Sequence, residues 1–68
     1  MAVSYKRLWK LLIDRNMTKT EMRKAAGIST GALAKLGKNE NVNTEIIVRI
    51  CKALQCDISD VMELTEDK

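Results

Sequence analysis

Apolar residues recur at intervals of three and four along most of this chain, which is the spacing of one face of an α-helix. No sustained alternation of apolar and polar positions rich in β-branched residues occurs, so no strand is expected. The pattern predicts five helices. They cover about 4–14, 19–26 and 30–36, then a fourth that follows Asn43 and extends to Leu54, and a short fifth after Asp57.

The apolar positions of these helices predict one small hydrophobic core. Sixty-eight residues are enough for a single domain, 1–68, without disulfides or metal, although the core is small. Residues 65–68 are expected to form a frayed tail. The expected core residues are Tyr5, Leu8, Trp9, Leu12, Met22, Leu33, Leu36, Ile46, Ile47, Ile50, Cys51, Leu54, Ile58, Val61 and Met62.

The segment from residue 17 to residue 36 has the signals of two helices joined by a tight turn. Thr18 followed three residues later by Glu21 is the pattern of a capping box and predicts a helix start. Gly27 can adopt the left-handed conformation that ends this helix. Ile28 can fill the angle between the helices, and Ser29 can cap the second one. The segment therefore predicts a helix-turn-helix.

These residues resemble the helix-turn-helix of the phage-repressor family, also called Xre or Cro/CI-type, from about Tyr5 to Leu64. The resemblance implies an all-α, compact five-helix, lambda-repressor-like bundle. Arg23 stands where the family usually has a small alanine, so either its stem extends to solvent or the two helices pack slightly differently. The positions that match the family are Leu8, Leu12, Met17, Thr18, Met22, Gly27, Ile28, Ser29, Leu33, Leu36, Gly37, Ile46, Ile47, Ile50, Cys51, Ala53, Leu54, Asp57, Ile58, Val61 and Met62.

The resemblance also implies sequence-specific binding to double-stranded DNA, with the helix at about 30–36 inserted into the major groove. The residues expected to face base edges are Ser29, Thr30, Gly31 and Lys35. The residues expected to contact phosphates are Lys19, Thr20, Lys38, Asn39 and Asn41. Lys35 can equally bind a phosphate. Gly31 either lets the backbone approach the bases or is a tolerated surface glycine.

Charge is distributed unevenly along the chain. Residues 1–38 contain nine Lys or Arg and two acidic residues, a balance of +7. Residues 39–68 contain three Lys or Arg and seven acidic residues, a balance of −4, and together the halves give the net +3. A run of charge usually marks only a solvated face. Because the basic half coincides with the helix-turn-helix, we interpret it as an electrostatic footprint for phosphates.

Other classes of function lack the residues that they need. The chain has no His, its three glycines are isolated, and its two cysteines are too few for a zinc site, so no enzyme, cofactor, metal or small-molecule ligand is expected. Cys51 is expected to be a small core residue. No apolar run is long enough to span a membrane, and basic residues interrupt the N-terminal segment where a secretory signal would need apolar ones. The protein is therefore expected to be cytoplasmic.

The sequence thus predicts a DNA-binding transcriptional regulator that acts as a repressor. The alternative is a protein-interaction module of the antitoxin or anti-repressor type that uses the same fold. A homodimer through the fifth helix and the C-terminal residues is expected, because Ile58, Met62 and Leu64 exceed what one small core can bury. The competing interpretation is a monomer whose last helix covers its own core.

Overall fold

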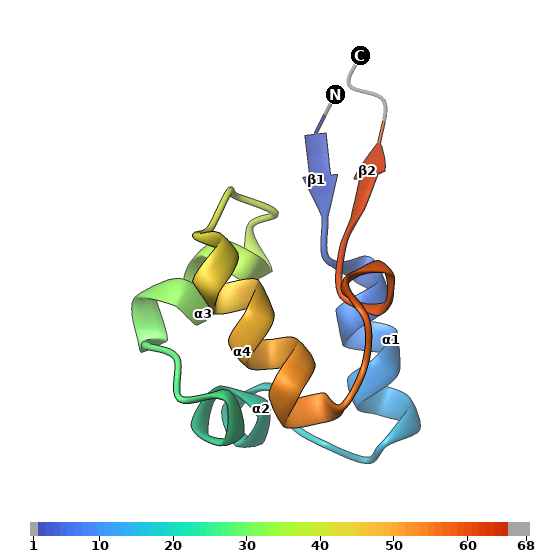
Figure 1. Ribbon diagram of the computed structural model, residues 1–68, viewed down its shortest axis with the longest axis vertical. Coiled ribbons are helices and arrows are strands. Elements are labelled where there is room, and N and C mark those ends of the chain that lie inside the picture. The colour runs from blue at the N-terminus through green and yellow to red at the C-terminus, as the bar shows by residue number, and fades with distance from the viewer. Residues whose placement is uncertain (1, 66–68) are drawn as a thin grey trace.

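The computed structural model describes residues 2–65 and contains four α-helices, one 3-10 turn and a two-stranded sheet (Figure 1). The elements in chain order are β1 (Ala2–Ser4), α1 (Lys6–Asp14), α2 (Lys19–Ala26), α3 (Thr30–Gly37), α4 (Thr44–Leu54), the 3-10 turn η1 (Ile58–Asp60) and β2 (Glu63–Thr65). The four α-helices match four of the five predicted helices closely. The fold is thus mostly helical, with the helix-turn-helix at α2 and α3.

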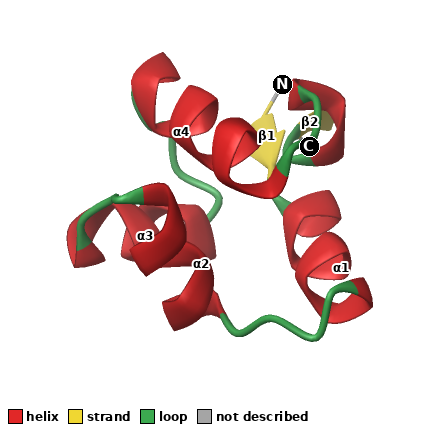
Figure 2. Ribbon diagram, turned by 60° about the horizontal axis from the view of Figure 1, so that its bottom comes forward, coloured by secondary structure: helices red, strands yellow, loops and turns green. Residues whose placement is uncertain are grey.

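Helix α4 lies between α1 and α3 in the view of Figure 1, and Figure 2 shows the same helices in red and the two short strands in yellow. Its stripe of Ile47, Ile50 and Leu54 is buried, and α4 packs most extensively against α2. Burial of each such side chain contributes about 1.5–3 kcal/mol. The complete set of buried apolar residues is Tyr5, Leu8, Leu12, Met22, Ala26, Ile28, Leu36, Ile47, Ile50, Leu54 and Val61.

Several residues predicted for the core lie at its edge. Trp9, Leu33, Ile46, Cys51 and Met62 are only partly buried and pack against the buried set. Ile58 lies outside it, since 49% of the residue is exposed.

The two strands were not predicted, and the expectation of an all-α chain was wrong on this point. β1 and β2 form an antiparallel ribbon that pairs Ala2 with Thr65, Val3 with Leu64 and Ser4 with Glu63. Three-residue strands are too short to show alternation in the sequence. Because Ser4 belongs to β1, α1 begins two residues later than the start expected from the sequence. Thr65 is paired and not frayed, and residues 66–68 lie outside the described part of the chain.

The predicted fifth helix is a single 3-10 turn, so the five-helix count was wrong. Asp57 caps this turn, because its carboxylate accepts from the Ile58 N–H at 2.8 Å. The carboxylate of Asp60 in turn accepts from the Asp57 N–H at 3.1 Å, which closes the turn on itself. The chain then enters β2 at Glu63, and too few residues remain for an α-helix.

Candidate nucleic-acid interface

The start of α2 and the turn into α3 have the local geometry that the sequence predicted. The Thr18 hydroxyl accepts from the Glu21 N–H at 3.1 Å, and the Glu21 carboxylate accepts from the Thr18 N–H at 2.8 Å, which completes the capping box. Gly27 adopts a left-handed φ of 69°, and the Ser29 hydroxyl accepts from the Ala32 N–H at 3.1 Å. These contacts fix both helices of the motif relative to the turn.

Two arginines that the sequence did not assign to the turn also bind its backbone. Arg49 of α4 donates to the Gly27 carbonyl at 3.2 Å and is held by an ion pair with Glu45 at 2.8 Å. Arg23 is half-buried and donates to the Ile28 carbonyl at 3.4 Å. The Arg23 side chain therefore lies along the turn. No sequence signal marked Arg49, because its partner is 22 residues away.

The residues predicted to read bases lie at the N-cap of α3 and on its exposed side. Leu36 is fully buried on the inner side, while Ser29, Thr30, Gly31 and Lys35 are exposed. An open groove runs beside this face, between α3 and the loop that leads to α4, and Lys35 and Asn41 contribute to its lining. The structure thus brings the four residues onto one surface.

The residues predicted to bind phosphates form two groups, and all five are exposed. Lys19 and Thr20 begin α2, where backbone N–H groups point outward and favour anions. The Lys19 ammonium lies 4.5 Å from the centre of the Trp9 ring, a cation–π contact that the sequence did not reveal. Lys38, Asn39 and Asn41 lie in the segment between α3 and α4.

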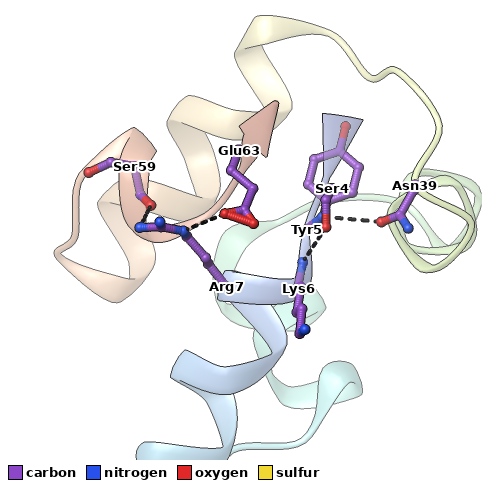
Figure 3. Close-up of polar contacts among 7 residues, drawn as sticks. All are labelled: Ser4, Tyr5, Lys6, Arg7, Asn39, Ser59 and Glu63. Carbon is purple, nitrogen blue, oxygen red and sulfur yellow. Dashed lines mark hydrogen bonds and ion pairs between the residues drawn. The ribbon is translucent and has the colours of Figure 1, made fainter. Parts of the chain in front are cut away.

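Asn39 is held from outside its own segment (Figure 3). Its side-chain oxygen accepts from the Tyr5 N–H at 3.1 Å, and the Tyr5 hydroxyl donates to the Glu40 carbonyl at 2.7 Å. On the other side of α1, Arg7 pairs with Glu63 of β2 at 2.8 Å and donates to the Ser59 carbonyl at 3.4 Å. Burial raises the pKa of the Tyr5 phenol above its ordinary value of 10.0, so the hydroxyl remains a donor at neutral pH.

The two cysteines lie at the C-terminal end of α4: Cys51 is in its last turn, and Cys56 is two residues beyond its last residue. The Cys56 N–H donates to the Cys51 carbonyl at 3.0 Å, and Gln55 between them adopts a left-handed φ of 52°, which is the Schellman arrangement. Both thiols are free, and burial raises the pKa of each above its ordinary value of 9.0, so both are protonated at neutral pH. Their placement is that of apolar residues at the end of a helix.

Within residues 2–65 there is no group of three or more His, Cys, Asp or Glu residues that could hold a metal ion. No buried side-chain nitrogen or oxygen in this part of the chain lacks a hydrogen-bond partner. None of the described helices is long and apolar enough to cross a bilayer.

Comparisons with known proteins agree with this geometry. Residues 7–67 match the family model of the Cro/C1-type HTH DNA-binding domain. The chain is 33% identical over 60 residues to the uncharacterized HTH-type transcriptional regulator YozG of Bacillus subtilis (strain 168), a match that covers 85% of this chain and 71% of YozG. The crystal structure of the transcriptional regulator VanUg, form II, aligns with a TM-score of 0.90 and 55% identity, over 96% of this chain and 88% of VanUg. The chain therefore belongs to the Cro/C1-type helix-turn-helix DNA-binding family.

Proposed function

We propose that this member of the Cro/C1-type family is a transcriptional repressor that binds a specific double-stranded DNA sequence with α3 in the major groove. The observation that carries the proposal is the surface of α3: Leu36 anchors the helix to the core, and Ser29, Thr30 and Lys35 are exposed together. Thr30, at the first position of the helix, can exchange hydrogen bonds with a base or contact a thymine methyl. A domain bound in this way prevents other proteins from binding the same stretch of DNA.

Phosphate contacts on both sides of α3 would set its position in the groove. Lys19 and Thr20 at the start of α2 and Lys38, Asn39 and Asn41 after α3 are all exposed. The proposal assigns them to the DNA backbone that flanks the groove. The surplus of nine basic over two acidic residues in 1–38 supports this assignment.

The same proposal includes a homodimer that binds two half-sites. Ile58 of η1 and Leu64 of the ribbon strand β2 are large apolar residues, yet they are 49% and 62% exposed. A two-fold axis through this patch would bury both copies of each residue. The acidic residues Asp57, Asp60 and Glu63 around Ile58 disfavour contact of this part of the surface with DNA phosphates.

Selection of binding sites from random DNA with the purified protein, followed by affinity measurements at several salt concentrations, tests the proposal. The logarithm of affinity should fall linearly with the logarithm of salt concentration, with a slope of about −0.9 per phosphate contact. Lys19→Ala should weaken binding to all sequences alike and reduce the slope by about one unit. Lys52→Ala, on the exposed side of α4, removes the same charge and should leave the slope unchanged.

Thr30→Ala separates base recognition from positioning. It should relax discrimination at one or two base pairs by about 1–3 kcal/mol each and leave the salt slope unchanged. A salt slope near zero for the wild type would contradict DNA binding. If a wild type with that slope bound a protein partner tightly, the protein-interaction alternative would be favoured. Unaltered base preference in Thr30→Ala would show that α3 does not dock as proposed.

A further inference from the structure

We propose that Tyr5 is a positioning residue for DNA binding, because it holds the segment 38–43 in the arrangement in which Lys38, Asn39 and Asn41 can reach phosphates. The inference rests on the proposed function and adds to it a residue that does not itself touch DNA. Tyr5 is 1% exposed and lies outside the helix-turn-helix, between β1 and α1.

Two hydrogen bonds connect Tyr5 to consecutive residues of this segment, and Figure 3 draws the one to Asn39. Its N–H donates to the Asn39 side-chain oxygen at 3.1 Å, and its hydroxyl donates to the Glu40 carbonyl oxygen at 2.7 Å. The partners are 34 and 35 residues away along the chain. The backbone of Tyr5 therefore holds the Asn39 side chain, and the buried Tyr5 side chain holds the backbone of Glu40.

The segment 38–43 is otherwise held by backbone hydrogen bonds to the neighbouring helices α3 and α4 and by partly buried Val42. It contains no helix or strand. Asn39, two residues after the end of α3, adopts a left-handed φ of 56°. The Glu40 N–H donates to the Lys35 carbonyl at 2.9 Å on the α3 side, and the Asn43 carbonyl accepts from the Ile46 N–H at 3.0 Å on the α4 side. The bonds from Tyr5 add an attachment from outside these two helices, and loop residues held in place before binding lose less entropy when they bind a ligand.

The bond to Asn39 also determines which end of its amide is presented. The amide oxygen is occupied by the Tyr5 N–H, whereas the amide NH₂ makes no hydrogen bond within the described residues. Asn39 is exposed, so this NH₂ group is available to solvent. Phosphate oxygens accept hydrogen bonds and donate none at neutral pH, so the orientation imposed by Tyr5 is the one that suits a phosphate.

Tyr5 also connects this loop to the ribbon formed by β1 and β2. It follows β1 directly, and β1 pairs with β2. A shallow hollow between the ribbon and the loop is lined by Val3 and Leu64 from one side and by Lys35 and Asn41 from the other. Tyr5 thereby fixes the proposed dimer patch relative to the proposed DNA-contacting residues.

Tyr5→Phe is the sharpest test, because it keeps the buried ring and removes only the bond to Glu40. Affinity for the selected DNA should fall about threefold to tenfold, the value of one hydrogen bond. Base preference should be unchanged, because α3 is not altered. The salt slope should become smaller, because phosphate contacts from the loop are weakened. Backbone amide NMR signals of residues 38–43 should shift, whereas those of α2 should not.

Ile50→Val is the matched control. Ile50 is fully buried in the middle of α4, and its truncation lowers stability by about 0.5–1.5 kcal/mol without touching a hydrogen bond of the loop. At a temperature where all variants are folded, its DNA affinity and salt slope should equal those of the wild type. If the wild type binds DNA and Tyr5→Phe binds it with the same affinity and salt slope, this inference is overturned and the proposed function is not. Failure of the wild type to bind DNA would overturn the proposed function, and this inference with it.

Discussion

Four residues with positive φ follow the ends of the four α-helices. Gly27 follows α2 with φ of 69°, whereas Asn16, Asn39 and Gln55 follow α1, α3 and α4 with φ between 52° and 56°. A residue in this region lets the chain reverse direction directly after a helix. Only glycine adopts it without a steric cost from a Cβ atom.

Gly27→Ala should destabilise the protein by about 1–2 kcal/mol, because alanine at φ of 69° is strained. A Cβ at Gly27 would meet the Arg49 guanidinium at 3.6 Å, an ordinary contact, so the cost comes from the backbone. Gly37→Ala is the control: it lies in α3 with no neighbour within 4 Å of an added Cβ, and it should stabilise by about 0.5–1 kcal/mol. Urea unfolding measures both, and equal effects of the two substitutions would refute the backbone argument.

The titration of Tyr5 should be visible in the alkaline stability of the protein. Because burial raises the folded-state pKa above 10.0, the stabilisation from protonated Tyr5 is complete below pH 10 and is lost as pH rises through the folded pKa. The difference in unfolding free energy between wild type and Tyr5→Phe should therefore shrink above about pH 10. A difference independent of pH up to the alkaline limit of folding would contradict this expectation.

At this scale, local sequence signals explain some residues and miss others. Thr18, Glu21, Gly27 and Ser29 act within a few residues of each other, so their pattern predicts their contacts. Tyr5 was expected only as a core residue, because its hydrogen-bond partners lie in a distant segment.

At the scale of elements, the two helices of the DNA-binding motif are capped by side chains, whereas α4 is not. Asn43, which the sequence predicts directly before this helix, occupies the N-cap position of α4 with an extended backbone, but its side chain makes no capping hydrogen bond. The Thr18 and Ser29 hydroxyls both accept from backbone N–H groups. Short helices depend more on such caps than does the longer, buried α4.

Thr18→Ala should therefore cost about 1 kcal/mol of stability, since it leaves the Glu21 N–H without its partner. Asn43→Ala, at the same position of α4, should change stability by less than about 0.5 kcal/mol. Thermal unfolding of the two variants beside the wild type provides the comparison. A loss at Asn43 as large as the loss at Thr18 would show that side-chain capping does not distinguish the helices.

Element boundaries were predicted well where apolar spacing continues over several turns, as in α4, and poorly where an element is three residues long. The spacing of Ile58, Val61 and Met62 would place them on one face of an α-helix. In the structure Ile58 begins a 3-10 turn and is exposed, whereas Val61 follows the turn and is buried. The strand pairing that follows, from Glu63, determines this outcome. Local periodicity contains no information about such pairing.

At the scale of the whole molecule, the basic residues concentrate in 1–38, which carries α2 and α3, whereas the C-terminal segment from η1 onward is acidic and apolar and packs against α1 and β1. A dimer through Ile58 and Leu64 would place one recognition helix on each side of the two-fold axis. Repressors of this geometry read half-sites about 34 Å apart, one turn of DNA.

Leu64→Thr should shift the protein toward the monomer and abolish cooperative binding to a two-half-site operator, with little loss of affinity for a single half-site. Threonine keeps the strand preference while removing apolar surface. Ile13→Thr is the control, because Ile13 is 73% exposed on α1 and lies outside the ribbon. Sedimentation at micromolar protein, with and without DNA, detects the change. A wild type that remains a monomer and occupies one half-site in both conditions would exclude the dimer.

The ribbon also determines how the molecule responds to force. Ala2 and Thr65 form its outermost pair, followed inward by Val3 with Leu64 and then Ser4 with Glu63. The hydrogen bonds between antiparallel strands run perpendicular to the strands. A pull that separates the two strands at their outer end therefore acts along these bonds and breaks them one residue pair at a time. The ribbon should yield at low tension, and only after it has opened do the helices bear load.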